Sequence, residues 1–229
     1  MIDRLMRYGA VARLLGPAPD GTILDVGAGP EGLGACLPYR FVGVDPWYPE
    51  PPIPTQQAIR ASATALPFAA ESFDHVLCIE VLEHLSPDIR PRVVAEMCRV
   101  ARRQIIITHP YGRLTRCTDH LMRFFFALLR VFGKSRPWWL MEHLQNPYPD
   151  PRLYLPSPSS QWSIRSEGQE NVFLRPVVAI FGNVRRVSRY FKRLHERRPA
   201  IARRLVRLFN FPPYSRKVIV LRRIETGTG

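Results

Sequence analysis

The chain contains 229 residues, a length that suits one α/β domain with a substantial buried core. Its hydrophobic content of 46% is ordinary for a globular protein, and its apolar stretches are shorter than the ~18 residues that a membrane-spanning helix needs. The four cysteines are scattered, without a paired spacing that suggests a metal site, which favours free thiols in a reducing cytoplasm. The chain does not start with a basic and then apolar leader, so we expect a cytoplasmic protein without a secretory signal.

Charge divides the chain into two unequal halves. Residues 1–110 carry 10 basic and 12 acidic side chains, for a net charge of −2. Residues 111–229 carry 23 basic and 7 acidic side chains, for a net charge of +16. The second half is therefore the part that would attract an anionic partner.

The first half alternates strands with helices, an order that predicts a parallel sheet covered by helices. A helix is predicted over residues 2–15, which place apolar side chains on one face and end at Gly16-Pro17. Strands are predicted over residues 22–26 and 41–45. The proline-rich segment 46–54 favours neither regular element and precedes a third strand.

A further helix and strand complete this half. Ser86-Pro87 is typical of a helix start, and the apolar residues of the predicted helix share one face. These apolar residues are Ile89, Val93, Met97 and Val100. Residues 104–108 are predicted to form a fifth strand, which ends at His109-Pro110.

The second half is less regular. Residues 119–132 are predicted to be helical, and the prolines of residues 146–160 predict a long extended loop or lid. The basic segment 185–207 has helical periodicity with a break at Pro199, and the run 218–221 predicts a buried final strand. The basic segment has two predicted apolar faces, which consist of Val187, Phe191 and Leu194, and then of Ile201, Leu205 and Leu208. A sixth strand is not placed by the sequence.

The most informative feature is a glycine turn between two apolar strands that each end in an acid. Its residues are Ile23-Leu24-Asp25-Val26-Gly27-Ala28-Gly29-Pro30-Glu31-Gly32, followed by Val42-Gly43-Val44-Asp45. Glycines allow positive φ and close approach of a ligand, and the following helix presents unpaired N–H groups and the positive end of its dipole. Asp45 is placed to accept hydrogen bonds from ribose hydroxyls. The turn therefore predicts a pocket for a nucleoside-bearing cofactor.

Two classes of cofactor use such a turn. The spacing of Gly27, Gly29 and Gly32 satisfies the dinucleotide fingerprint. A dinucleotide would bring its pyrophosphate onto this loop, where the carboxylate of Asp25 would repel it. S-adenosylmethionine has no phosphate and carries a cationic amino-acid tail, so it tolerates this acid. The residues therefore favour S-adenosylmethionine.

Three further motifs follow in order, namely Leu66-Pro67-Phe68, Ser72-Phe73-Asp74 and Glu80-Val81-Leu82-Glu83-His84-Leu85. Together with the glycine turn, they resemble the class I S-adenosylmethionine-dependent methyltransferases, in particular the large group that reads LPF…SFD…EVLEHL. The resemblance covers residues 20–110. It implies a Rossmann-like α/β fold with a mostly parallel seven-stranded sheet and helices on both faces. In this chain a basic helical insertion is expected in the C-terminal half.

The resemblance also implies roles for individual residues in binding S-adenosylmethionine. Asp25, together with the backbone of Gly27 and Gly29, would hold the methionine end of the cofactor. Asp45 would bind the ribose diol.

The remaining implied contacts lie at the adenine and at the methyl group. Ala63 would flank the adenine, and Glu80 would lie beside the transferred methyl group. The family usually has an acid before this alanine, whereas this chain has Ser62. A hydroxyl can still accept the hydrogen bond from the adenine amino group, less strongly than a carboxylate.

Candidates for a general base follow from position, because ligands of open α/β sheets lie outside the carboxyl ends of the strands. His109, directly after the fifth strand, is the first candidate and His84 is the second. His120 and the pair Glu142-His143 are further candidates, and for each histidine the alternative is a hydrogen-bonded structural role. Because Glu83 and His84 are only two adjacent residues, we expect no metal site there.

An aromatic cluster, Trp138-Trp139-Leu140-Met141-Glu142-His143-Leu144, precedes the proline-rich loop. One interpretation is a wall of the acceptor site, in which aromatic rings pack on an apolar or sugar-like molecule. The other is a small satellite core beneath the loop. The sequence does not decide between them.

The basic segment 185–207 has three interpretations. It is a solvated face packed on the domain, a helix on an anionic membrane surface, or a contact with nucleic-acid phosphates. Because no recognised nucleic-acid-binding motif accompanies it, nucleic acid ranks below the membrane.

We therefore expect one methyltransferase domain over residues 1–229, with a cofactor-binding half (1–110) and a basic substrate or cap half (111–229). The expected reaction is methyl transfer from S-adenosylmethionine to a small or lipid-linked metabolite, with oxygen as the favoured acceptor atom. The alternatives are a non-catalytic cofactor-binding accessory protein and, ranked lower, an RNA methyltransferase. We expect a cytoplasmic location, with any peripheral contact on the inner face of an anionic membrane.

Overall fold

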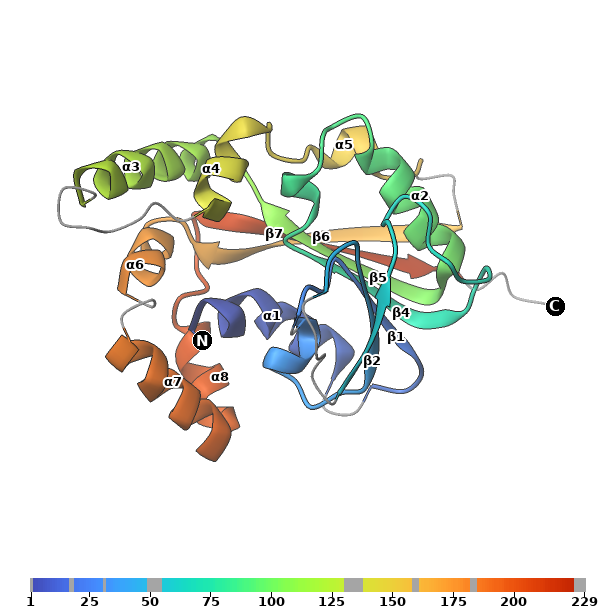
Figure 1. Ribbon diagram of the computed structural model, residues 1–229, viewed down its shortest axis with the longest axis horizontal. Helices are drawn as coiled ribbons and strands as arrows, with labels where there is room; N and C mark the ends of the chain where they lie inside the picture. Colours follow the sequence, from blue (N-terminus) through green and yellow to red (C-terminus); the bar gives the residue numbers. More distant parts are fainter. Residues whose placement is uncertain are drawn as a thin grey trace.

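The computed structural model describes residues 2–16, 19–30, 32–48, 55–129, 138–157, 161–181 and 185–224. The described residues form one sheet from the strands β1 (Ile23–Val26), β2 (Phe41–Asp45), β3 (Gln56–Arg60), β4 (Phe73–Ile79), β5 (Ala101–Pro110), β6 (Trp162–Asn171) and β7 (Tyr214–Arg223). The strand order is β3-β2-β1-β4-β5-β7-β6 (Figure 1). Strands β1 to β5 are parallel, and β7 is antiparallel to both of its neighbours. The prediction of a mostly parallel seven-stranded sheet is confirmed.

Helices cover both faces of this sheet, as expected (Figure 1). Their bounds are α1 (Ile2–Leu15), α2 (Arg90–Val100), α3 (Arg113–Leu129), α4 (Trp138–Gln145), α5 (Pro151–Tyr154), α6 (Leu174–Phe181), α7 (Arg185–Arg197) and α8 (Pro199–Arg207). Helices α2 and α5 lie on one face of the sheet, and α1, α6 and α8 lie on the other. None of the helices in the described ranges is long and apolar enough to cross a lipid bilayer.

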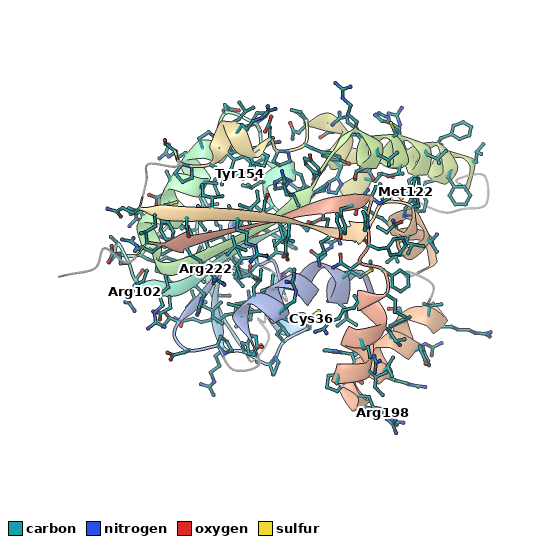
Figure 2. The ribbon with its side chains drawn as sticks, turned by 180° about the vertical axis from the view of Figure 1, so that it is seen from behind. Cys36, Arg102, Met122, Tyr154, Arg198 and Arg222 are labelled. Atoms are coloured by element: carbon teal, nitrogen blue, oxygen red, sulfur yellow. The ribbon has the colours of Figure 1, made fainter. Side chains whose placement is uncertain are left out.

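Two hydrophobic cores, one on each face of the sheet, hold these layers together. Alternate residues of a strand point to opposite faces. In β7, Val218 and Val220 belong to the core beneath α1, whereas Ile219 belongs to the core beneath α2. Cys36 and Tyr154 accordingly lie on opposite sides of the sheet (Figure 2). The run 218–221 therefore forms the buried strand that its composition predicts.

The parallel strands end along one edge of the sheet, where ligands of such folds bind. Gly27 follows β1, Asp45 ends β2, Ser62 lies just after β3 and Glu80 follows β4. The fold thus brings together motifs that are widely separated in the sequence.

The predicted start of α2 and the predicted buried face of α8 are both wrong. Helix α2 begins at Arg90 rather than at Ser86, and Ile89 caps it without a side-chain hydrogen bond. The predicted face of α2 is correct, because Val93, Met97 and Val100 are buried. In α8 the buried residues are Ala202 and Val206, whereas the predicted Ile201 and Leu208 are exposed. The break at Arg198 shifts the face of α8 that meets α1.

Three other elements differ from the sequence-based expectation. The glycine turn continues into a 3₁₀ helix over Gly32–Ala35 rather than a longer helix, since two glycines within it disfavour extension. The strand β6 has few apolar residues and lies at the edge of the sheet, so periodicity does not mark it. The predicted loop 146–160 contains the single turn α5, in which Asp150 accepts a hydrogen bond from the backbone N–H of Arg152. The predicted loop residues 49–54 and 158–160 lie outside the described residues.

Candidate functional site

The glycine turn after β1 adopts backbone conformations that require glycine. The φ angles of Gly27, Gly29 and Gly32 are +75°, +57° and +43°. A Cβ atom on Gly27 would lie 2.4 Å from Cγ2 of Val81, which follows β4. The N–H of Gly27 donates to the carbonyl of Val44 at 2.7 Å, and this bond ties the turn to β2. The turn is therefore fixed between the ends of β2 and β4.

Asp25 supports this turn from within the protein. Its carboxyl group is buried and accepts a hydrogen bond from the N–H of Leu33 at 2.9 Å. Burial, opposed by the Leu33 hydrogen bond and assisted by the nearby charge of Asp45, raises the pKa of Asp25 to about 7. Asp25 does not line the cavity in front of the turn. Its position therefore suits shaping the loop rather than the direct contact with the methionine end that the resemblance implies.

This buried acid predicts a pH-dependent stability of the protein without cofactor. The native carboxyl group keeps its proton up to about pH 7, whereas the unfolded one loses it near pH 4. The free energy of unfolding should therefore decrease as the pH rises from about 4 to about 7. Asp25→Asn should remove this fall and stabilise the protein at pH 8 by up to about 4 kcal/mol. Urea unfolding at pH 5 and pH 8 measures the effect. Asp20→Asn is the control, since this side chain is 94% exposed, and equal pH slopes for all three proteins would contradict the prediction.

Asp45 and Ser62 approach the same cavity from neighbouring strands. The carboxylate of Asp45 accepts hydrogen bonds from the N–H groups of Gly29 at 3.1 Å and Trp47 at 2.9 Å. The hydroxyl of Ser62 is hydrogen-bonded to that of Thr64 at 2.8 Å and accepts the N–H of Thr64 at 3.2 Å. The carboxylate of Asp45 thus also holds the glycine turn, and Ser62 holds the turn that carries Ala63.

Glu80 lies at the end of β4 in an uncommon conformation, with a φ of +58°. Its buried carboxylate accepts a hydrogen bond from Thr108 at 3.3 Å and lies 3.1 Å from Nε of Arg216. Burial, the largest single effect, would raise the pKa of Glu80, but the nearby positive charges, with Arg216 the strongest of them, together outweigh it and lower the pKa. Arg216 also lies 2.9 Å from the carboxylate of Glu170. One buried arginine from β7 therefore pairs with two buried carboxylates.

These elements enclose a cavity of about 690 Å³. Six of the seven predicted cofactor-binding residues line it, namely Gly27, Gly29, Asp45, Ser62, Ala63 and Glu80. Arg4, Arg7 and Tyr8 of α1 also line it, and the helical pattern of residues 2–15 carries no signal that they would do so. A second cavity, of about 830 Å³, lies between α1 and α8 and contains none of the predicted site residues.

The two predicted bases lie in different places. His84 lines the cavity, and its Nδ1 lies 2.7 Å from the carboxylate of Glu142 in α4. Burial, followed by the charge of His143, lowers the pKa of His84. His109 is fully buried outside the cavity, where Nε2 is hydrogen-bonded to the hydroxyl of Tyr154 at 2.7 Å and Nδ1 to the carbonyl of Pro110 at 2.8 Å. Burial lowers the pKa of His109 to about 4. Because His109 lies outside the cavity, the geometry gives no support to His109 as the base.

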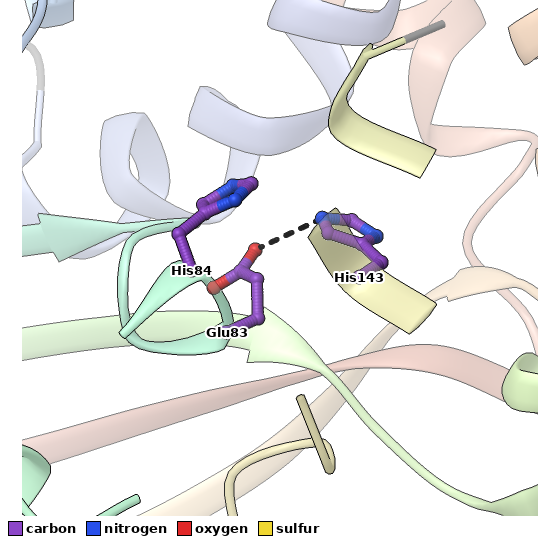
Figure 3. A group of neighbouring side chains, drawn as sticks. All are labelled: Glu83, His84 and His143. Carbon is purple, nitrogen blue, oxygen red and sulfur yellow. Dashed lines mark ion pairs between the residues drawn. The ribbon is translucent and has the colours of Figure 1, made fainter. Parts of the chain in front are cut away.

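A cluster of buried polar side chains lies beside His84 (Figure 3). Nε2 of His143 in α4 lies 3.7 Å from Glu83, and Nδ1 lies 3.6 Å from Asp119 in α3. Asp119 also pairs with Arg175 and accepts a hydrogen bond from Tyr148. The sequence pointed to the pair Glu142-His143 but carried no signal that Asp119 and Glu83 would join it. His120, the other candidate, is exposed on α3.

Part of the sequence matches known proteins. A family model described as a methyltransferase domain matches residues 24–107. Uncharacterized methyltransferases of Mycobacterium avium and Mycolicibacterium paratuberculosis are each 37% identical to the chain over 113 residues. These matches cover 44% of this chain and 42% of each relative, so the chain matches less than half the length of these curated relatives.

Solved structures share the fold over nearly the whole chain. The plantazolicin methyltransferase, solved in complex with SAH, is similar with a TM-score of 0.54 and 12% identity, over 97% of this chain and 84% of that chain. A chain from the complex of the Haloferax volcanii Trm112 methyltransferase activator with a methyltransferase also has a TM-score of 0.54 and 12% identity. That similarity covers 100% of this chain and 96% of the other. At this identity, the structural similarity establishes the fold.

The family match and the fold agree on the same region. The matched residues 24–107 run from β1 into β5 and contain the glycine turn, Asp45 and Glu80. Over these residues the chain is similar to the methyltransferase domain family and to the two mycobacterial methyltransferases.

Proposed function

We propose that the protein transfers the methyl group of S-adenosylmethionine to an oxygen atom of a small or lipid-linked acceptor. The observation that carries this proposal is the cavity at the carboxyl edge of the sheet, where the glycine turn, Asp45 and Glu80 meet. Methyl transfer is an in-line displacement at an already activated sulfonium. The protein mainly has to align the two reactants and exclude water.

In this proposal, each predicted residue has a role in holding the cofactor. The backbone of Gly27 and Gly29 holds the methionine end, and Asp25 keeps their turn in shape. Asp45 accepts hydrogen bonds from the ribose, and Ala63 packs on the adenine with Ser62 beside it. The plantazolicin methyltransferase, which shares the fold, was solved with SAH bound.

We propose that His84, rather than His109, acts at the acceptor hydroxyl. His84 lines the cavity close to Glu80, and Glu142 fixes its orientation. A side chain at this position can reach an acceptor that enters between the turn after β4 and helix α4. In this view residues 111–229 are the acceptor half, since α4 supplies Glu142.

A lipid-linked acceptor is supported by the surface of the same half. Helix α3 exposes Leu121, Phe124 and Leu128, which are 65%, 63% and 54% accessible. Helix α7 carries arginines, and Figure 1 shows α3, α6 and α7 along one side of the molecule. Exposed apolar residues on the same side of the molecule as a basic helix suit contact with an anionic membrane surface.

Binding and transfer experiments test these proposals. In calorimetry we expect S-adenosylmethionine and S-adenosylhomocysteine to bind and NAD not to bind, and the reverse would overturn the cofactor assignment. With methyl-labelled cofactor, label should then enter the water-soluble metabolites or the lipids of a cell extract. Label found only in RNA would favour RNA methylation. Cofactor binding without any transfer would favour the non-catalytic accessory protein.

A further inference from the structure

Glu83, His84 and His143 lie where a metal ion could be bound. Glu83 and His84 belong to the 3₁₀ turn after β4, and His143 projects from α4 on the other side (Figure 3). One ligand atom from each of the three lies within 4.8 Å of the others. We propose that these three side chains bind a divalent transition-metal cation, such as zinc, beside the cofactor cavity.

The spacing of Glu83 and His143 suits ligands better than hydrogen-bond partners. Ligand atoms about 2.0–2.2 Å from a tetrahedral zinc ion lie about 3.4 Å from one another. Oε1 of Glu83 and Nε2 of His143 are 3.7 Å apart, close to that spacing and too long for a hydrogen bond. Two imidazoles and one carboxylate are a ligand set that catalytic zinc sites use, with a further position open to water or substrate.

Glu83 differs from the neighbouring buried acids in lacking a strong partner. Glu80 is paired with Arg216, and Asp119 is paired with Arg175. The side chain of Glu83 has no accessible surface, and neither of its oxygens has a hydrogen-bond partner in another of the described residues. A buried carboxylate without such a partner is costly, and a bound cation would supply the missing charge.

Carboxylates outside the trio lie next to the Nδ1 atoms of the two histidines. Nδ1 of His84 lies 2.7 Å from Glu142, and Nδ1 of His143 lies 3.6 Å from Asp119. Asp119 is itself fixed by Arg175 and Tyr148. Metal-binding histidines commonly have a carboxylate against the other ring nitrogen, which orients the ring and raises its basicity.

This site, which rests on the proposed function for its catalytic use, explains how His84 acts at the acceptor. A cation with an open position binds the acceptor hydroxyl and lowers the pKa of that hydroxyl, so the proton leaves to water. The resulting oxygen attacks the methyl carbon, and the carbon–sulfur bond breaks with its electron pair remaining on sulfur. His84 then serves as a ligand rather than as the proton acceptor.

Metal titration of the full chain tests the site without any acceptor. After treatment with a chelator, the protein should bind one Zn²⁺ per chain in calorimetry, and one Co²⁺ should give the visible absorption of a low-coordinate site. Glu83→Gln and His143→Ala should each weaken Zn²⁺ binding by more than about tenfold. His120→Ala, which removes an exposed histidine of α3, should leave the affinity unchanged.

The outcomes separate this proposal from the proposed function. Absence of Zn²⁺ and Co²⁺ binding, or equal affinity in Glu83→Gln and the unmodified protein, would overturn the metal site. Glu83→Gln preserves the size of the side chain, and its thermal unfolding shows whether it remains folded. If S-adenosylmethionine binds and metal does not, only the metal site fails. If metal binds and S-adenosylmethionine does not, only the proposed function fails.

Discussion

Replacing Arg216 with methionine should lower the free energy of unfolding by about 3–5 kcal/mol, because two buried carboxylates would lose the same cation. Arg216 is 3% accessible and lies 3.1 Å from Glu80 and 2.9 Å from Glu170. Both carboxylates are also buried, so water cannot replace the lost charge. They would have to take up protons or draw in solvent, and either change destabilises the native protein relative to the unfolded chain.

Urea unfolding at neutral pH measures this effect against a matched control. Arg102 in β5 also pairs with an acid, Asp74, but its side chain is 51% exposed. Arg102→Met should therefore cost less than about 1 kcal/mol. If Arg216→Met fails to fold, Arg216→Lys still tests the idea, because it keeps the charge and should recover part of the stability. Equal losses in Arg216→Met and Arg102→Met would contradict the prediction.

Replacing Gly29 with alanine should weaken the binding of S-adenosylmethionine by more than about tenfold, or 1.4 kcal/mol. Gly29 lines the cavity, and a Cβ atom there would have no protein atom within 4 Å. The new methyl group would thus take up space next to the backbone that the proposed cofactor approaches. Its φ of +57° also makes alanine unfavourable by about 1–2 kcal/mol, an effect on folding rather than on binding.

Gly112→Ala separates the effect on binding from the effect on the backbone. Gly112 also has a positive φ, of +88°, and a methyl group added there would meet open space, but this glycine does not line the cavity. Both variants should lose a similar amount of stability in thermal unfolding. Calorimetry should then show weak cofactor binding for Gly29→Ala and normal binding for Gly112→Ala. Normal binding by both would place the cofactor away from this turn.

The arrangement of residues 1–110 could be predicted because its signals are local. A glycine with positive φ, an apolar run ending in an acid and the order of motifs can each be read over a few residues, and Gly27, Asp45 and Glu80 lie where that reading expects them. The exception is Asp25, whose burial behind the turn depends on how the 3₁₀ helix packs over it. Sequence alone gives the acid but not the direction in which it points.

The contacts between residues 1–110 and residues 111–229 could not be predicted in the same way, because they join distant segments. His109 was expected just after the fifth strand but lies inside β5, near its end, and Tyr154 covers its ring from a turn much later in the chain. Likewise, Glu83 meets His143 only after α4 has packed against the turn that follows β4. In the sequence, the adjacent residues Glu83 and His84 gave no reason to expect a metal site. His143 was identified only as a separate candidate for a general base.

The position of β7 links the two halves of the chain during synthesis. This strand is made after all the others, yet it lies between β5 and β6 and pairs with both. Until it emerges, β5 presents an unpaired edge that includes the apolar residues Ile105 to Ile107, a surface prone to association with other chains. The same strand carries Arg216, which pairs with Glu80. Residues 1–110 therefore gain a paired β5 edge and the ion pair of Glu80 only when the last strand arrives, so a chain that ends before β7 would lack both the β5–β7 pairing and the Arg216–Glu80 pair.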